Sequence, residues 1–425
     1  MNVLVVGGGG REHALCWTLA RAARVYCAPG NAGTAEIATN LAIPVSDHDG
    51  LLDAVRTHDI DLTVVGPEAP LAAGLADRLR AAGRYVFGPS SAAARIEASK
   101  AFAKRLMRDA GVPTAAAETF TDADRAAAYI AAHAEPLVVK ASGLTAGKGA
   151  IVCGTRSEAV DAARAMFGGR FGAAGTEVIV EQFLDGEELS VLALTDGERV
   201  MILPPSQDHK RIGEGDTGPN TGGMGAYTPV SIATPSLIAR VEREILLPTL
   251  RALADQGCRY RGVLYAGLMI SPCGDPLVIE FNCRFGDPET QVILPVAGCE
   301  LLDELWRIAA DDGWIPDPVS VPANRAAVTT VLAAAGYPDA PQKGQAITIA
   351  DRLPADTVLF HAGTRRDPDG TLRSAGGRVL CATGFGPDVS TAAAASRLLA
   401  EQVTFDGKQY RRDIGWREIA RARAS

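Results

Sequence analysis

Short apolar runs that stop at glycine or proline dominate the first hundred residues. They are residues 3–6, 25–28, 62–65 and 85–87. Polar stretches that fit helices separate them, and the first of these is expected to run from Arg11 to about Arg24. A strand buried on both faces is apolar throughout rather than alternating. The pattern therefore predicts a doubly wound parallel sheet, whose ligands would bind beyond the carboxyl ends of the strands.

The middle of the chain predicts strands that pair in antiparallel fashion. A helix is expected at 99–111, where the first unit ends. The expected strands after it are 136–140, 150–153, 177–182, 186–194, 200–204, 262–270 and 276–282. Residues 206–225 are polar and glycine-rich without periodicity, so we expect a long irregular loop there. Loops of that length in compact enzymes are usually functional.

After Asn324 the chain again becomes rich in short strands separated by glycine. The expected strands are 327–332, 348–349, 358–361 and 379–383. We therefore predict an α/β fold, α+β in its later parts, with three domains. These are an N-terminal Rossmann-like domain at 1–100, a middle domain at 101–325 with a lid subdomain at about 115–187, and a C-terminal α+β domain at 326–425.

Composition excludes several classes of function. The 425 residues include 42 Lys and Arg against 50 Asp and Glu, a net charge of −8, and only 5 % are aromatic. Neither value fits a general nucleic-acid binder. The eight cysteines form no C-x-x-C pair, so we expect buried free thiols in a reducing cytosol. With no apolar run of about 18 residues and no secretory signal pattern, the prediction is a cytoplasmic protein that binds no membrane.

The first candidate site is the glycine cluster Gly7–Gly10. It is not a dinucleotide fingerprint, because Glu12 and His13 occupy the positions where G-x-G-x-x-G needs its last glycine. A glycine turn at a helix N-terminus suits a phosphate, since free N–H groups and the helix dipole favour an anion. A simple tight turn explains the glycines equally well.

The second candidate is the segment Lys140–Gly149. It is not a Walker A motif, because three residues separate Gly143 from Gly147 and a glycine follows Lys148. A flexible loop between two strands, with one lysine at a strand end and one in the loop, could close over a triphosphate. The alternative is an ordinary hairpin with solvated lysines.

The third candidate is the end of the strand at 276–282. Alternation places Glu280 and Asn282 on one face, and their oxygens are ligands that Mg²⁺ accepts. Arg284, next on that face, could clamp a phosphoryl group. The alternative is an exposed polar face, which is disfavoured because Val278 would precede Glu280 on it.

The fourth candidate combines residues 206–211 with 216–225. These segments hold acids, bases, amides and hydroxyls in a glycine-rich frame, which suits a polyhydroxy phosphorylated ligand. Within them His209 is more typical of a structural hydrogen-bonding residue than of a catalyst.

Taken in order along the chain, these segments resemble the ATP-grasp superfamily, and more narrowly the phosphoribosylamine–glycine ligase family. The resemblance runs almost from end to end. It includes GGREHAL (9–15), APGNAGT (28–34), VGPEAPL (65–71), KASGLTAGKG (140–149), EQFLDGEE (181–188), SQDHKR (206–211), DTGPNTGGMGAY (216–227), VIEFNCRFGDPETQ (278–291), FHAGT (360–364) and RRDIGW (411–416). The chain departs from the family at Ser142, where Asp is usual, and at Thr145, where a small residue is usual.

The resemblance implies a reaction and its cofactors. ATP, glycine and 5-phosphoribosylamine would give ADP, phosphate and glycinamide ribonucleotide through a glycyl phosphate, in purine biosynthesis. The implied cofactors are ATP and Mg²⁺ (or Mn²⁺), the other partners are the two small substrates, and the assembly is a monomer or homodimer.

The resemblance also implies roles for individual residues. The middle domain would be the ATP-grasp domain, and its metal ligands would be Glu280 and Asn282. Residues expected at ATP are Lys100, Lys140, Gly147, Lys148, Gly149, Glu181, Phe183, Leu184 and Glu188. Residues expected at phosphoribosylamine and glycine are Gly9, Gly10, Asn31, Gly33, Thr34, Glu68, Asp208, Thr221, Gly222, Arg284 and Asp287. Arg284, Lys148 and Asp208 would be the catalytic residues.

Two alternatives stay open at this point. One is another ATP-grasp carboxylate–amine ligase or a biotin-carboxylase-like enzyme, and residues 216–227 with 284–291 distinguish the first family from it. The other is a nucleotide-binding relative without catalysis, against which the intact Glu280, Asn282 and Arg284 argue.

Overall fold

The N-terminal region is a five-stranded parallel sheet. The computed structural model describes residues 1–145, 147–298, 300–316 and 325–424. The strand order is β3 (Thr39–Asn40), β2 (Arg24–Pro29), β1 (Asn2–Gly7), β4 (Leu62–Val65) and β5 (Tyr85–Phe87). The helices are α1 (Gly10–Leu19), α2 (Thr34–Ile37), α3 (His48–Thr57), α4 (Glu68–Ala72), α5 (Leu75–Ala81) and α6 (Ser91–Ala98). The four predicted strands are confirmed, and their apolar residues other than Tyr85 are buried.

The first helix is shorter than predicted. It ends at Leu19, and the chain turns before β2 begins at Arg24. The expectation of a helix to Arg24 was therefore wrong. The residues after Leu19 have good helical propensity, but they are needed to reverse the chain toward the sheet.

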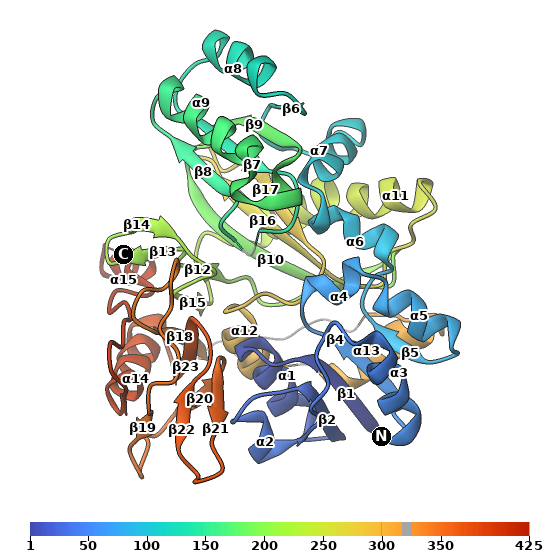
Figure 1. The fold of residues 1–425 in the computed structure, drawn as a ribbon, viewed down its shortest axis with the longest axis vertical. Coiled ribbons are helices and arrows are strands. Elements are labelled where there is room, and N and C mark those ends of the chain that lie inside the picture. The colour runs from blue at the N-terminus through green and yellow to red at the C-terminus, as the bar shows by residue number, and fades with distance from the viewer. Residues whose placement is uncertain (146, 299, 317–324, 425) are drawn as a thin grey trace.

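A small antiparallel sheet forms the segment predicted as a lid subdomain, which is called the lid below. Its order is β6 (Ala117–Phe120), β9 (Val178–Gln182), β7 (Leu137–Ala141) and β8 (Ala150–Cys153). It is joined by α8 (Ala123–Ala132), α9 (Arg156–Ala165) and two short turns, η1 (Met166–Arg170) and η2 (Gly172–Gly175). The apolar residues of the lid form a core of their own, separate from the main cores. In Figure 1 the lid stands above the rest of the molecule.

The central sheet contains the hairpin predicted at 262–282. Its order is β11 (Val200–Ile202), β10 (Glu187–Thr195), β16 (Gly262–Ile270) and β17 (Pro276–Asn282). The helices of this region are α7 (Lys100–Asp109), α10 (Pro235–Val241), η3 (Glu242–Leu246), α11 (Leu247–Asp255), α12 (Thr290–Val296) and α13 (Leu301–Ala310). The predicted antiparallel pairs are confirmed.

The C-terminal sheet draws strands from two distant parts of the chain. Its order is β12 (Gln207–Asp208), β15 (Gly225–Thr228), β18 (Ala326–Ala333), β23 (Arg378–Gly386) and β20 (Thr357–His361). Two-stranded ribbons add β13 (Arg211–Gly213) with β14 (Thr217–Asn220), β19 (Thr348–Ile349) with β24 (Val403–Thr404), and β21 (Thr364–Arg366) with β22 (Leu372–Ser374). Helix α14 (Val389–Glu401) packs on this sheet, and α15 (Trp416–Ala424) ends the chain.

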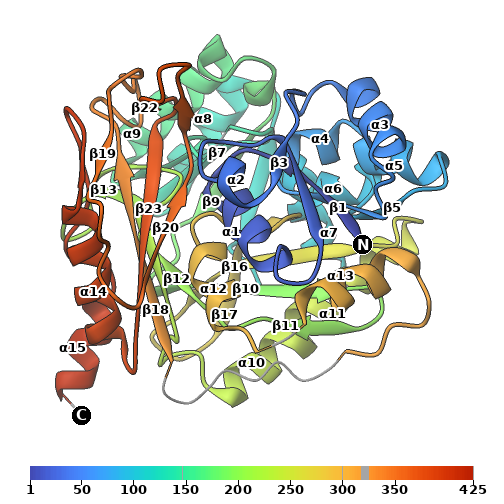
Figure 2. The same ribbon diagram turned by 90° about the horizontal axis from the view of Figure 1, so that it is seen from below.

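The expectation of an irregular loop at 206–225 was wrong. Half of that segment lies in short strands, because β12 pairs with β15 and β13 pairs with β14. Figure 2 shows the C-terminal sheet beside the N-terminal sheet, with α14 and α15 on its outer side. No helix within the described residues is long and apolar enough to cross a membrane. The α/β multidomain class is confirmed.

Candidate functional site

The end of β17 presents the two expected metal ligands. A β-bulge interrupts the strand, because Gly267 pairs with Glu280 while Leu268 pairs with Val278. The extra residue turns Val278 to the same core as Phe281, so Val278 does not share the face of Glu280 as predicted. The bulge leaves Glu280 and Asn282 together on the opposite, polar face.

Glu280 is a carboxylate among cations. Burial opposes its ionisation, but Lys210, Lys100 and Lys140 hold its pKa below the ordinary value. Within the described residues, no donor lies within hydrogen-bond or ion-pair distance of its carboxylate. A hard-oxygen pair of this kind, with phosphates and water completing the shell, fits Mg²⁺ or Mn²⁺. The described residues contain no cluster of three or more His, Cys, Asp or Glu side chains that could hold a metal ion alone.

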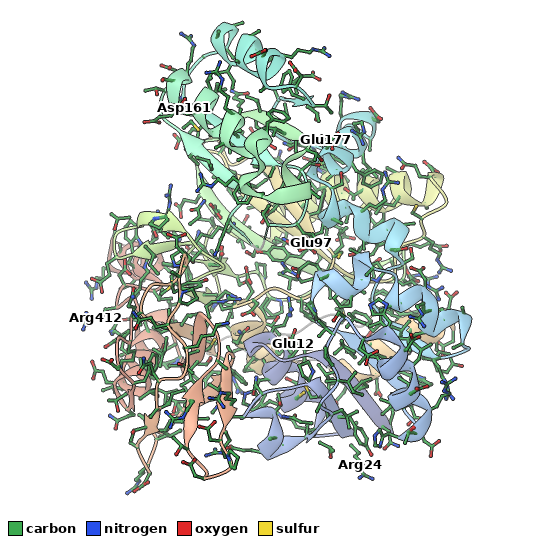
Figure 3. The ribbon with its side chains drawn as sticks, viewed as in Figure 1. Glu12, Arg24, Glu97, Asp161, Glu177 and Arg412 are labelled. Atoms are coloured by element: carbon green, nitrogen blue, oxygen red, sulfur yellow. The ribbon has the colours of Figure 1, made fainter. Side chains whose placement is uncertain are left out.

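Arg284 joins the metal-ligand pair to two acids of the N-terminal region. Its guanidinium donates to Asn282 Oδ1 at 3.2 Å and lies 3.0 Å from Glu97 and 3.3 Å from Glu68. Glu97 also accepts the Cys283 N–H at 2.7 Å. Figure 3 places Glu97 at the centre of the molecule, between the lid and the N-terminal sheet. Glu97 has no motif of its own and was not predicted as a site residue.

Among the residues expected at ATP, a buried carboxylate bridges two lysines. Glu181, at the end of β9, lies 2.8 Å from the Lys140 ammonium and 3.3 Å from that of Lys104. Lys140 also donates to the carbonyl of Ile279 at 3.1 Å, so it reaches the bulge beside Glu280. Lys104 was missed, although it follows Lys100 by one helical turn and therefore shares its face of α7.

The glycine loop connects β7 to β8 as predicted, and Ala141 N donates to Gly149 O at 2.9 Å. Lys100 donates to Gly143 O at 3.2 Å, and burial lowers its pKa. The ammonium of Lys148 donates at 2.7 Å to Pro338 O in the C-terminal region. In this conformation the Lys148 side chain is therefore bonded to the C-terminal region. Ala146 of this loop and Cys299 lie outside the described residues.

The unusual Ser142 lies at the base of this loop, against the start of α7. Its hydroxyl donates to Glu177 at 3.0 Å and accepts the Ala101 N–H at 3.2 Å. Figure 3 shows Glu177 beside α7, at the base of the lid. Glu177 therefore supplies a carboxylate beside Ser142, where the family usually has an aspartate.

Phe183 and Leu184 are half-buried in the segment that links β9 of the lid to β10 of the central sheet. Glu188, early in β10, lies 2.6 Å from the Lys210 ammonium. The expected adenine and ribose residues thus follow the strand that carries Glu181.

Asp208, in β12, is a buried carboxyl group in an acidic environment. Burial raises its pKa to about 8, against the effect of Lys210 4.0 Å away, and Glu289 adds to the rise. Glu289 accepts hydrogen bonds from Tyr265 at 2.6 Å and Ser190 at 3.3 Å. Lys210 and Glu289 were missed, although both lie inside segments that the sequence analysis singled out.

The glycine turn before α1 contains its own anion. Glu12 Oε2 accepts the Gly9 N–H at 2.6 Å. A Cβ on Gly7 or Gly66 would collide with the Glu12 side chain, so the carboxylate is enclosed by both turns. This geometry favours the tight-turn interpretation of the cluster, because a protein carboxylate already occupies the anion position. In Figure 3 Glu12 lies between the N-terminal and C-terminal regions.

Asn31 organises the second turn expected at the substrate. Its carbonyl oxygen accepts the N–H groups of Gly33 at 2.8 Å and Thr34 at 3.0 Å. Its amide donates to Gly8 O at 3.0 Å and to His361 O at 2.8 Å. The turn is therefore fixed by Asn31 against both the first glycine turn and the C-terminal sheet.

Some of the residues expected at phosphoribosylamine and glycine meet around Asp287. Gln291 donates to one Asp287 oxygen at 2.8 Å, and Arg378 pairs with the other at 3.0 Å. A Cβ on Gly9 would lie 3.5 Å from that second oxygen, and one on Gly10 would lie 2.6 Å from Gln291 Nε2. Arg378 was missed.

The loop with Thr221 and Gly222 adjoins this cluster. Thr221 donates to Lys210 O at 2.8 Å, and Gly222 O accepts from Arg378 at 2.6 Å. A Cβ on Gly147 would lie 3.4 Å from Thr221 O, so the glycine loop touches the same segment.

These contacts arrange the predicted residues in two groups that meet at Arg284. The nucleotide group comprises Lys100, Lys140, Glu181, Glu280 and Asn282, and Asp208 with Lys210 adjoins Glu280. The acceptor group comprises Gly9, Gly10, Asn31, Gly33, Thr34, Glu68, Thr221, Gly222 and Asp287. Arg284 reaches this group through its ion pair with Glu68. The arrangement can bind a metal–nucleotide complex on one side and a second, polar substrate on the other.

The fold defines a class of enzyme. A biotin carboxylase structure from Campylobacter jejuni superimposes with a TM-score of 0.72, covering 96 % of this chain and 92 % of that chain at 14 % identity. That likeness concerns the fold alone. The family model described as "Phosphoribosylglycinamide synthetase, ATP-grasp (A) domain" matches residues 98–290. The chain thus contains the ATP-grasp fold.

Matches outside that segment narrow the class. Models for the N domain and C domain of phosphoribosylglycinamide synthetase match residues 1–97 and 327–417. A phosphoribosylamine–glycine ligase from Nostoc sp. is 50 % identical over 98 % of this chain and 99 % of its own length. The crystal structure of that ligase from Thermotoga maritima has a TM-score of 0.85 at 37 % identity, covering 97 % of this chain and all of that chain. The chain belongs to the phosphoribosylamine–glycine ligase family.

Proposed function

We propose that the protein joins glycine to 5-phosphoribosylamine, with hydrolysis of ATP to ADP and phosphate, in purine biosynthesis. The observation that carries this proposal is the charge arrangement at the end of β17. A carboxylate without a partner among the described residues lies beside an amide oxygen, and Lys100, Lys140 and Arg284 surround the pair. Such a set suits Mg²⁺ (or Mn²⁺) with the phosphates of ATP. We also propose a cytoplasmic location, which the free thiols of the described cysteines support.

The reaction is proposed to pass through glycyl phosphate. The glycine carboxylate would attack the γ-phosphorus, ADP would leave, and the amine nitrogen would then displace phosphate from the acyl carbon. Lys100, Lys140 and Lys148 would neutralise phosphate charge, and Arg284 would stabilise the acyl phosphate. Bound at Glu280 and Asn282, the metal ion would neutralise charge on the phosphate oxygens.

Asp208 is proposed to handle the proton that the amine nitrogen loses when the amide forms. A pKa of about 8 suits transfer near neutral pH. Its carboxylate form can accept the proton, and Lys210 beside it stabilises that form. The turns around Asn31 and Asp287 would hold the phosphoribosyl group.

The nucleotide is proposed to lie along the segment after β9. Glu181, Phe183 and Leu184 would face the adenine, and Glu188 would lie near the ribose. Gly147 and Gly149 would let the loop close over the phosphates, which requires Lys148 to leave Pro338 O. Thr221, Gly222 and Glu68 would complete the acceptor pocket.

The test is ADP release with Mg²⁺, ATP, glycine and freshly generated phosphoribosylamine, omitting one component at a time. Turnover that requires every component is expected. Turnover that proceeds without the amine, or with another amine acceptor only, would contradict the proposed substrate. Detection of ¹⁸O transfer from labelled glycine carboxylate to phosphate checks the acyl phosphate, because that route moves one carboxylate oxygen to phosphate.

A further inference from the structure

Arg378, at the start of β23, bonds to two separate segments of the acceptor group. Its Nη1 donates to Gly222 O at 2.6 Å and to Asp287 O at 2.8 Å. Its Nη2 pairs with the Asp287 carboxylate at 3.0 Å. One guanidinium from the C-terminal sheet therefore fixes the loop at 221–223 and the segment after β17 relative to each other.

Tyr337 supports the same loop from the C-terminal region. Its hydroxyl accepts the Gly222 N–H at 3.0 Å. Its ring packs on the residue before Arg378, because a Cβ on Gly377 would lie 2.5 Å from the ring. Both backbone polar groups of Gly222 are thus bonded by residues of the C-terminal region.

These bonds fix the direction of a carboxylate. Asp287 has one oxygen held by Gln291 and the other by Arg378, and the latter oxygen faces Gly9 of the first glycine turn. A planar guanidinium can serve a carbonyl pair and a carboxylate at once, whereas an ammonium is a point charge without that fixed geometry. The position of Asp287 should therefore depend on arginine specifically.

We propose that Arg378 is a positioning residue of the acceptor subsite. It holds the Asp287 carboxylate and the loop at 221–223 in the geometry that binds phosphoribosylamine, so the C-terminal region completes the site. This inference rests on the proposed function, since it names the substrate whose binding Arg378 supports. It gives Arg378 no direct role at ATP.

The test compares Arg378→Lys and Arg378→Gln with a matched control, Arg373→Lys. Arg373 lies on β22 of the same region and also bonds to a carboxylate, Asp367, and a carbonyl, Gly344 O, away from the site. Losing charged hydrogen bonds at Arg378 should raise the KM for phosphoribosylamine about 10-fold or more. The KM for ATP should change less than about 2-fold. The KM for phosphoribosylamine should rise more in Arg378→Gln than in Arg378→Lys.

The possible outcomes distinguish a failure of the proposed function from a failure of the positioning role. Wild-type protein without turnover on phosphoribosylamine would contradict the proposed function itself. Wild-type turnover with Arg378 variants that match Arg373→Lys in every KM would overturn the positioning role. If the Arg378 variants do not fold, Tyr337→Phe decides, because it removes only the acceptor of the Gly222 N–H. It should raise the same KM about 3-fold, and an unchanged KM would overturn the proposal.

Discussion

The nucleotide group and the acceptor group differ in how their polar atoms are satisfied. On the nucleotide side, the Glu280 carboxylate has no donor within bonding distance among the described residues, and its neighbours are cationic. On the acceptor side, Glu12 bonds to the Gly9 N–H and the Asn31 side chain makes five hydrogen bonds to backbone groups.

The difference separates two ways of preparing a site. The proposed ligands of the nucleotide group, a metal ion and three phosphate groups, would bring charges of their own, and the Glu280 carboxylate has no donor among the described residues. The acceptor turns instead satisfy their own backbone, which fixes their shape before any ligand arrives. Substitutions on the nucleotide side should therefore mainly affect catalysis, and those on the acceptor turns should mainly affect stability and substrate KM.

The largest effect should come from Glu280→Gln, which removes the charged ligand from the proposed metal site. Turnover should fall about 1000-fold, equivalent to about 4 kcal/mol of transition-state stabilisation. The unfolding temperature should change little, because no described residue bonds to this carboxylate. Near-normal turnover at saturating Mg²⁺ would contradict the metal assignment, and Glu244→Gln in η3, away from the site, serves as control.

Glu181→Gln tests the exception on the nucleotide side, a buried carboxylate already bonded to protein. Lys104 and Lys140 would lose the anion they share, so the free energy of unfolding should fall by about 3 kcal/mol. Urea denaturation measures this. Adding Lys104→Met should recover part of the loss, and the absence of coupling in that double-mutant cycle would show that the pair is not energetically linked.

Asn31→Ala should break the acceptor turn. Five backbone groups would lose a partner, and we expect a loss of about 2 kcal/mol in unfolding free energy. The KM for ATP should stay the same while that for phosphoribosylamine rises. Asn2→Ala, which removes hydrogen bonds at an exposed edge, is the control. A larger effect on ATP than on the amine would reverse the comparison.

The acceptor side should also be acid-sensitive. Burial and the neighbouring His361 lower the pKa of His13 to about 3, and burial with Arg366 lowers that of His361 to about 4. Below pH 6.5 these two histidines take up protons in the unfolded chain but stay neutral in the folded chain. Stability should therefore fall as pH drops from 6.5 toward 4, by up to about 1.4 kcal/mol per pH unit for each histidine.

The variant His13→Gln isolates one of these histidines. It should flatten the dependence of unfolding free energy on pH in that window, relative to wild type, when measured by urea denaturation. An unchanged slope would mean that His13 does not contribute to acid sensitivity.

The smallest effect is expected for Ser142→Asp, which restores the residue usual in the family. The new carboxylate would lie beside Glu177, but the N-terminus of α7 at Ala101 would offset the repulsion. We expect the KM for ATP to change less than about 5-fold. A change above 10-fold would show that Glu177 does not replace that carboxylate, and Glu177→Gln combined with Ser142→Asp would then separate the two charges.

Apolar patterning predicted most of the fold because it reports burial locally. The runs at 3–6 and 262–270 became buried strands at the expected places. The strands β12 to β14 were not predictable, because their residues are polar and their pairing depends on distant partners. The bulge at Ile279 also escaped prediction, since alternation assumes a regular strand.

The same distinction applies to the site. Residues within motifs, such as Lys140 and Glu280, could be singled out because their neighbours in sequence share their chemistry. Arg378 could not be singled out, because its role depends on its bonds to Asp287, which is 91 residues away in the chain. Lys104 lies between these cases, since its spacing from Lys100 was a usable signal.

The shared C-terminal sheet has a consequence for synthesis of the chain. Strand β15 ends at Thr228, but its partner β18 begins only at Ala326. At about 5–20 residues per second, the ribosome needs on the order of 5–20 s to supply the missing strand. During that time one edge of β15 is open to other nascent chains, so slowing elongation within this interval should raise aggregation more than slowing it before β12.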